Sequence, residues 1–492
     1  MRKKLLLTFM LLGCTAVAQH FRFAQLTDIH LNSKLPERKE QLAESIQRIN
    51  SLDSLDFVLI TGDISDDGDR PAMMEVKRSI DRLRVPYYIV MGNHETKWSD
   101  SGCMAWKDIF GYERFEFEYQ GVHFLGFNTG PLMRMAYGHV VAQDLAWLKE
   151  RLDSYPKDEP VIIVTHYPLL KGDVDNWYEV TDLLRHYNVR LCIGGHYHSM
   201  CNHSYDGIPG VLLRSNIREH DTGTGFGLYE VTRDSISLTV MNSLTPPARF
   251  AFYAMRGPIR DKDGLVLDPD AGAREYPDSS DNVTYSQVER VWLHHSGVSV
   301  YSSPAVEGKR VFVGDDAGCV TAYRLRDGKS LWRFQTGARI IGTPAASDGV
   351  LVVPSADGCI YGLKTSSGRQ VWKVQTDAPV LGAVAIRDGI AYVGGSDHCM
   401  RALDVRSGRV CWTYSGVEGY IEARPLVTDR HVVFGAWDMY LYSLRLQDGS
   451  LEWKSRGVDR DDMHYSPPAV WPVETGGRIF IADPERALTC ID

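Results

Sequence analysis

Five tryptophans in the C-terminal half of this 492-residue chain recur at an almost constant interval. They are separated by 40, 40, 40 and 41 residues: Trp292, Trp332, Trp372, Trp412 and Trp453. A turn of one type stands before four of them: Asp327-Gly328, Ser367-Gly368, Ser407-Gly408 and Asp448-Gly449. Apolar segments with strand character, such as Ala391–Gly394, lie upstream of the turns. Short strands repeated at this period predict a β-propeller with one four-stranded blade in each repeat.

The last repeat is shorter than the others. It starts at Arg478 and reaches Asp492, which aligns with Asp404 of an earlier repeat, so it lacks the glycine turn and the tryptophan. Residues 286–492 are therefore expected to hold about four blades and a partial one, an incomplete propeller. A truncated gene product is the simpler explanation, and a ring completed by another chain is the alternative.

These repeats resemble quinoprotein-like (PQQ-type) propellers, a family shared by quinone-dependent dehydrogenases and a bacterial outer-membrane assembly factor. The resemblance covers residues 286–492. It rests on the closing tryptophans, on Ala356-Asp357-Gly358 and on Leu403-Asp404 before a glycine turn. Dehydrogenases of this family need further groups around the quinone, often adjacent cysteines. The chain has no Cys-Cys pair, so no bound quinone is predicted.

The N-terminal half alternates strand-like and helix-like segments. Candidate strands are Phe21–Leu26, Phe57–Thr61, Tyr87–Met91, Val122–Phe127, Val161–Thr165, Val189–Ile193 and Val211–Arg214, then Phe226–Val240 with a turn at Arg233-Asp234-Ser235. Apolar residues at helical spacing predict helices over Pro36–Leu52 and Gln143–Leu152. This alternation predicts an α/β domain with a largely parallel sheet. Side chains that follow the strands are then expected to meet at one edge of that sheet.

Five polar blocks stand after these strands. They are Asp28-x-His30, Gly62-Asp63, Gly92-Asn93-His94-Glu95, His166 and Gly195-His196-x-His198. Imidazole, carboxylate and amide ligands in one set suit Mn, Fe or Zn rather than a thiolate-bound zinc. The number of ligands predicts two divalent ions held side by side, which is an arrangement used for hydrolysis of phosphate esters.

In this order the blocks resemble those of calcineurin-like metallophosphoesterases. The resemblance implies a four-layer αββα sandwich over residues 19–242. It implies a bridging Asp63, one metal on Asp28, His30 and His198, and a second metal on Asn93, His166 and His196. A metal-bridging hydroxide would attack a phosphate mono- or diester. His94 would be the catalytic histidine that binds no metal, stabilising charge on the phosphate or protonating the leaving group.

Two roles stay open in this half. Glu95 is expected either to orient His94 or a neighbouring group, or to be an ordinary surface or helix-cap residue. In the polar loop after residue 214, Arg218 or His220 is a candidate contact for the substrate phosphate, and an ordinary surface loop is the alternative.

The N-terminus has the pattern of a signal peptide. Arg2, Lys3 and Lys4 precede the apolar core Leu5–Leu12, and Ala16-Val17-Ala18 offers a cleavage site. We therefore expect residues 1–18 to be removed and the protein to be exported, periplasmic or secreted. A lipid anchor at Cys14 is less favoured. No other stretch is long and apolar enough to predict a transmembrane segment.

Residues 243–285 are rich in turn-forming residues and are predicted to be a linker, with some strand character around Arg249–Met255. The net charge of −9 argues against nucleic-acid binding through a basic surface. The whole sequence predicts an exported phosphoesterase whose propeller binds a protein or polysaccharide. Two alternatives remain: an envelope scaffold with a silent hydrolase domain and, more weakly, a quinone-dependent oxidoreductase.

Overall fold

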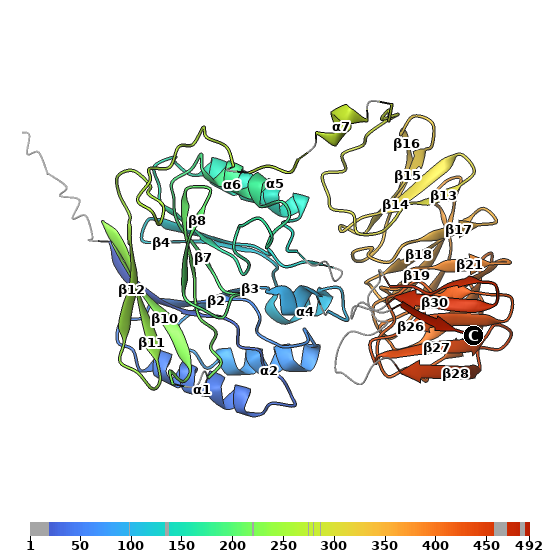
Figure 1. Ribbon diagram of the computed structural model, residues 1–492, viewed down its shortest axis with the longest axis horizontal. Coiled ribbons are helices and arrows are strands. Elements are labelled where there is room, and N and C mark those ends of the chain that lie inside the picture. Colours follow the sequence, from blue (N-terminus) through green and yellow to red (C-terminus); the bar gives the residue numbers. More distant parts are fainter. Residues whose placement is uncertain are drawn as a thin grey trace, which may run out of the picture.

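The computed structural model describes residues 19–97, 99–132, 137–218, 221–273, 275–278, 280–285, 287–456, 470–482 and 488–492. The expected signal peptide, 1–18, lies outside them. The described chain forms an α/β domain and a β-propeller that lie side by side (Figure 1). Among the described helices, none has the length and apolar character needed to cross a membrane.

Two six-stranded sheets form the centre of the α/β domain. The first has the order β12-β11-β10-β1-β2-β3: β1 (His20–Leu26), β2 (Phe57–Thr61), β3 (Tyr87–Val90), β10 (Gly225–Thr232), β11 (Ser235–Asn242) and β12 (Ala248–Ala254). The second has the order β4-β5-β6-β7-β9-β8: β4 (Phe115–Tyr119), β5 (Val122–Gly126), β6 (Val161–Val164), β7 (Val189–Gly194), β8 (Cys201–Tyr205) and β9 (Ile208–Leu212). Within them β1, β2 and β3 are parallel, as are β5, β6, β7 and β9.

The prediction of one largely parallel sheet is therefore too simple. The parallel strands divide between two sheets, and tight turns add antiparallel strands at the edges. The turn between β10 and β11 lies where the sequence predicts it. A second turn, with positive φ at Asp206 and Gly207, pairs β8 with β9 and starts β9 three residues before the predicted strand. This combination of angles is favoured in two-residue hairpins.

Helices cover the outer face of each sheet, which completes four layers (Figure 1). On the first sheet lie α1 (Glu37–Asn50) and α2 (Arg70–Ile80), and on the second α5 (Ala142–Ser154) and α6 (Trp177–Leu184). The predicted apolar face of α1 is buried in the outer core: Leu42, Ile46 and Ile49. Between the sheets lie aromatic side chains, including Phe23 and Phe57, whose rings stack at 5.1 Å. The αββα architecture is confirmed.

Among the residues that the structure describes, the propeller has four sheets of four antiparallel strands and one sheet of three. Its strands are β13 (Ala305–Glu307), β14 (Arg310–Gly314), β15 (Cys319–Arg324) and β16 (Ser330–Gln335); β17 (Ala345–Ser347), β18 (Val350–Ser355), β19 (Cys359–Lys364) and β20 (Gln370–Gln375); β21 (Ala385–Arg387), β22 (Ile390–Gly394), β23 (Met400–Asp404) and β24 (Val410–Tyr414); β25 (Leu426–Val427), β26 (His431–Gly435), β27 (Tyr440–Arg445) and β28 (Leu451–Arg456); β29 (Val473–Thr475), β30 (Arg478–Ala482) and β31 (Leu488–Ile491). The all-β propeller is confirmed, and its described strands form four four-stranded sheets and one three-stranded sheet.

The repeated tryptophans join neighbouring repeats. Trp372 in β20 donates its indole N–H to the carbonyl of Val405 in the next blade, at 2.8 Å. A Cβ on Gly408 would lie only 2.6 Å from that indole, and Gly408 has φ +72°. The same pairing recurs three times: Trp292 with Leu325 and Gly328, Trp332 with Thr365 and Gly368, and Trp412 with Leu446 and Gly449. The spacing of 40 therefore follows from one contact per blade.

The segment between the two parts is partly ordered. The strand character expected around Arg249–Met255 corresponds to β12, which pairs with β11 at the edge of the first sheet. A short helix, α7 (Asp281–Thr284), follows before the propeller. On the α/β side, α3 (Asn93–Lys97) and α4 (Met104–Phe110) follow β3, and α4 lies on the side that faces the propeller (Figure 1).

Candidate metal centre

Each predicted ligand lies in a loop directly after a parallel strand. Asp28 and His30 follow β1, Asp63 follows β2, and Asn93 is at the start of α3 after β3. From the second sheet, His166 follows β6, and the pair His196 and His198 follows β7. The ligands therefore come from both sheets and meet at the carboxyl edge of the sandwich.

The backbone of this centre is unusual for non-glycine residues. Five of its members have positive φ, between 48° and 75°: Asp28, His30, Asp63, His196 and His198. Such a conformation costs an L-residue about 1 kcal/mol or more, and it is concentrated at functional sites. Gly92 adds a close approach, because a Cβ there would lie 2.1 Å from an Asp63 carboxylate oxygen. The loops are bent to bring polar side chains together.

Asp28, His30 and His198 form the first group. The two Nε2 atoms of the histidines lie 3.0 Å apart, and Asp28 Oδ1 lies 3.3 Å from that of His198 and 3.8 Å from that of His30. Asp28 Oδ1 is buried and has no hydrogen-bond partner. A buried carboxylate oxygen without a donor is costly, and two facing imidazole nitrogens share at most one proton between them. A cation among these three atoms would satisfy all of them.

The second group contains Asp63, His166 and His196, whose ligand atoms all lie within 4.8 Å of one another. His166 Nε2 lies 3.0 Å from Asp63 Oδ2 and 3.0 Å from Asn93 Oδ1. A third group, His30, Asp63 and His94, overlaps with both. Asp63 is thus shared by the second and third groups, and His30 is shared by the first and third, so Asp63 is the carboxylate that links two groups, as expected of a bridging ligand.

Hydrogen bonds on the far side of two of the imidazoles direct their Nε2 atoms toward the centre. His166 Nδ1 donates to the carbonyl of Thr61 at 2.7 Å, and His30 Nδ1 donates to Asp66 Oδ1 at 2.8 Å. Such bonds fix the tautomer that leaves Nε2 able to bind a metal. Asp66 was not found by sequence reasoning, because its only signal is a carboxylate three residues after Asp63.

Glu95 connects two of the ligand loops. Its carboxylate is buried and accepts hydrogen bonds from the amides of Ile64 and Ser65 at 3.0 Å and from that of Gly92 at 2.9 Å. The bond to Gly92 also caps α3, so Glu95 both supports the ligand loops and caps a helix. The expectation that Glu95 is a surface residue is wrong, because its side chain is buried.

His94 lies at the rim of the centre. Its backbone amide donates to Asp63 Oδ1 at 2.9 Å, and its Nδ1 bonds to the carbonyl of Asp66. The Nε2 atom is then directed inward, 3.8 Å from Asp63 Oδ2, and 23% of the side chain is exposed. Burial lowers the pKa of His94, which favours the neutral imidazole. The ring can therefore reach both the centre and the solvent.

Charge coupling is strong in the metal-free centre. Burial raises the pKa of Asp63, but the neighbouring His166 outweighs it and the pKa is about 2. Burial lowers the pKa values of His30 and His166, but the carboxylates raise them to about 10 and about 9. For His196 burial dominates, and its pKa is about 3. The carboxylates are thus ionised, and two of the histidines hold protons that a metal would displace.

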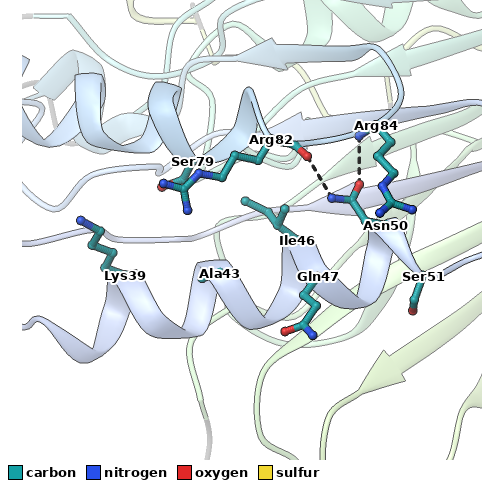
Figure 2. Close-up of a pocket in the computed structure, with 9 residues that line it drawn as sticks. All are labelled: Lys39, Ala43, Ile46, Gln47, Asn50, Ser51, Ser79, Arg82 and Arg84. Carbon is teal, nitrogen blue, oxygen red and sulfur yellow. Dashed lines mark hydrogen bonds between the residues drawn. The ribbon is translucent and has the colours of Figure 1, made fainter.

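Two other regions do not join this centre. The guanidinium of Arg218 pairs with Glu44 of α1 at 3.0 Å, and His220 lies outside the described residues. A groove of about 440 Å³ lies between α1 and the connection from α2 to β3 (Figure 2). It is lined by Lys39, Ala43, Ile46, Gln47, Asn50, Ser51, Ser79, Arg82 and Arg84. No predicted ligand lines it, so it is separate from the candidate metal centre.

Comparison with known families agrees with the division of the chain into an α/β domain and a propeller. Residues 21–200 match the family model of calcineurin-like phosphoesterases. Residues 283–415 and 316–492 match the family model described as outer membrane protein assembly factor BamB. The α/β domain thus belongs to the calcineurin-like phosphoesterases and the propeller to the BamB-like repeats. The chain is a phosphoric ester hydrolase with an appended propeller.

Individual relatives of the α/β domain are phosphodiesterases by name. A probable glycerophosphodiester phosphodiesterase of Arcobacter nitrofigilis is 29% identical over 199 residues, which is 35% of this chain and 70% of that protein. A 3′,5′-cyclic-nucleotide phosphodiesterase of Nostoc is 27% identical over 195 residues, 36% of this chain and 70% of that protein. A probable cyclic nucleotide phosphodiesterase of Coxiella burnetii is 27% identical over 196 residues, 37% of this chain and 78% of that protein.

Among solved structures, that of BamB from Moraxella catarrhalis aligns with 41% of this chain and 76% of its own, at 18% identity and a TM-score of 0.31. The propeller architecture rests instead on the five sheets and on the contacts between blades described above.

Proposed function

We propose that this protein is an exported phosphodiesterase that uses two divalent metal ions. The expected ligands are Asp28, His30, Asp63, Asn93, His166, His196 and His198. The observation that carries the proposal is a chain of three overlapping His/Asp groups, joined through His30 and Asp63, together with a buried Asp28 oxygen that accepts no hydrogen bond. The donor set fits Mn, Fe or Zn.

The residues of the chain then have distinct tasks. Divalent ions bound there would activate water and neutralise charge on the phosphate. Asp63 would hold both ions, and Glu95 keeps the loops of Asp63 and Asn93 in register through three backbone amides. His94, whose Nδ1–H is held by the carbonyl of Asp66, would in its protonated form donate a proton or a hydrogen bond from Nε2 to the departing oxygen.

A diester substrate is the narrower part of the proposal. The relatives in the comparison are named for glycerophosphodiesters and cyclic nucleotides, which are both diesters. We therefore propose that this chain also hydrolyses phosphate diesters, without assigning it a particular substrate. The propeller would add a binding module for an envelope protein or polysaccharide, in keeping with its BamB-like repeats.

Export rests on the basic and apolar pattern of residues 1–18. A mature protein recovered from the periplasm or medium is expected to begin at Gln19, which mass spectrometry of the intact chain would establish. A lipid-modified N-terminal Cys14 would instead contradict cleavage after Ala18.

Hydrolysis of bis-p-nitrophenyl phosphate and p-nitrophenyl phosphate with Mn²⁺ tests the proposal. Wild-type protein is expected to prefer the diester. Asp63→Ala should lose both metal and activity, whereas His94→Ala should keep its metal and lose activity by about 10²–10⁴-fold. Wild-type protein that binds two metals yet hydrolyses neither ester nor a wider panel would rule the proposal out.

A further inference from the structure

The two parts of the chain meet through a buried arginine of the propeller. Arg339, between β16 and β17, has a side chain only 10% exposed. Its guanidinium donates to the carbonyl of Gly102 at 3.0 Å and to Glu113 Oε1 at 2.6 Å, both in the phosphoesterase domain. Within the propeller it pairs with the buried Asp316 at 3.3 Å. The charge of Arg339 is therefore shared between the domains.

The segment that receives Arg339 is shaped for close contact. Gly102 has φ +59°, and a Cβ there would lie 2.7 Å from Cδ1 of Ile341 in the propeller. Next to it, Met104 at the start of α4 packs on an apolar cluster of the propeller: Ala338, Ile341, Ala356 and Leu381. The 99–104 turn and the propeller surface are complementary in shape as well as in charge.

This turn is linked directly to the metal-ligand loops. Cys103, which has φ +66°, donates two hydrogen bonds: its amide to Ser99 Oγ at 2.8 Å and its thiol to the carbonyl of Glu95 at 3.7 Å. Glu95 in turn holds the amides of Ile64, Ser65 and Gly92. Two sets of hydrogen bonds therefore connect the propeller contact to the loops that carry Asp63 and Asn93: the bond from Cys103 to Glu95, and the bonds that Glu95 accepts from the loop amides.

A cavity lies beside the Arg339 contact. Its volume is about 300 Å³, and its lining includes Arg339 and Asp316 from the propeller and Met91 and Asn128 from the phosphoesterase domain. Met91 directly follows β3, two residues before Asn93. The propeller thus borders the strand end that presents a predicted ligand.

We propose that Arg339 is a positioning residue for the metal centre: by holding the 99–104 turn it fixes Glu95 and, through Glu95, the loops of Asp63 and Asn93. The expected effect on catalysis rests on the proposed function. The expected effect on the position of the loops rests on the contacts alone. The propeller is then a support of the active site in addition to any binding role.

The test uses the full-length chain and charge-neutral pairs, so that no buried ion is left alone. Arg339→Met with Asp316→Asn removes the guanidinium that contacts Gly102 and Glu113, together with its buried partner in the propeller. Arg401→Met with Asp397→Asn is the matched control, because Arg401 is also buried and pairs with Asp397 inside its own blade. Hydrogen exchange of the amides of Ile64, Ser65 and Gly92 and steady-state kinetics on bis-p-nitrophenyl phosphate are the two measurements.

For the Arg339 pair we expect exchange at these amides to rise at least tenfold and kcat to fall about tenfold, with KM changed less than twofold. The Arg401 pair should have the same amide exchange and kcat as the wild type. The single variant Arg339→Lys, which keeps the positive charge, should lose less than the Arg339 pair in both measurements. If the Arg339 pair fails to fold, Glu113→Gln probes the same contact from a half-buried position, with a smaller effect in the same direction.

Unchanged exchange in the Arg339 pair, or equal effects in both pairs, would overturn the inference. Exchange is measured without substrate, so it decides the inference even if the wild-type protein hydrolyses no ester. That second result would count against the proposed function alone.

Discussion

At the scale of single residues, Asp66 supports two histidines of the metal centre at once. Its carboxylate accepts from His30 Nδ1 at 2.8 Å, and its carbonyl bonds to His94 Nδ1. Loss of a carboxylate that orients a ligating histidine typically costs about 10–100-fold in metal affinity. We expect Asp66→Ala to weaken Mn²⁺ binding by this factor, measured by titration of the metal-free protein.

The neighbouring Asp67 provides the control. It is exposed, whereas Asp66 is half-buried, and its carboxylate is not bonded to His30, so Asp67→Ala should leave the Mn²⁺ affinity within about twofold of the wild type. Equal losses in the two variants would show that general negative charge, and not orientation of His30, is what Asp66 contributes.

Metal binding should also depend on pH. The pKa values of His30 and His166 are raised to about 10 and about 9 in the metal-free centre, so below pH 9 a metal must displace protons from them. Raising the pH removes these protons and tightens binding, by about tenfold per pH unit for each proton displaced. The Mn²⁺ dissociation constant is therefore expected to fall between pH 6.5 and 8.5. A constant that stays flat or rises would contradict this.

The sequence is informative about ligands and less so about their supports. Asp28, His30 and Asp63 stand in short motifs after strands, and the structure brings them together as expected. Asp66 and Cys103 have no such motif, because their roles depend on how loops fold back on one another. The same holds for Arg339, whose partners in the phosphoesterase domain lie more than 200 residues away.

At the scale of elements, the contact of tryptophan with glycine determines how blades stack. Gly408 combines φ +72° with an indole 2.6 Å from the place of a Cβ. An alanine there must strain the backbone, at a cost of about 1–2 kcal/mol, and also displace Trp372, which adds about 1–3 kcal/mol. We expect Gly408→Ala to lower the urea midpoint of the propeller, followed by tryptophan fluorescence.

Gly349 separates the two costs. Its φ is +77°, yet a Cβ there would meet nothing within 4 Å. Gly349→Ala should therefore show the backbone cost alone. Equal destabilisation by the two substitutions would mean that contact with the indole contributes nothing to blade stacking.

Local patterns predict most elements of the propeller, since a two-residue glycine turn followed by a tryptophan is enough to recognise each blade. The arrangement of the α/β strands into two sheets is different. Strands of both sheets have the same buried apolar pattern, for example β2 and β6, so the pattern alone does not tell which sheet a strand joins. That choice is made by packing in three dimensions, here by the aromatic core between the sheets.

At the scale of the whole molecule, the propeller lies against the side of the phosphoesterase domain that carries α4 (Figure 1). The sequence predicts both parts and the segment between them. It does not predict their contact, because Arg339, Gly102 and Glu113 have no pattern that relates one part to the other. In our proposal this contact holds the loops of the candidate metal centre, which would be one function of the fusion.

Titration of metal-free protein with Mn²⁺, with hydrolysis of bis-p-nitrophenyl phosphate followed at each addition, tests the central claim most directly. The groups that meet at Asp63 predict activity that saturates at two equivalents of metal per chain. Saturation at one equivalent, or full metal binding without hydrolysis, would contradict the two-metal phosphodiesterase.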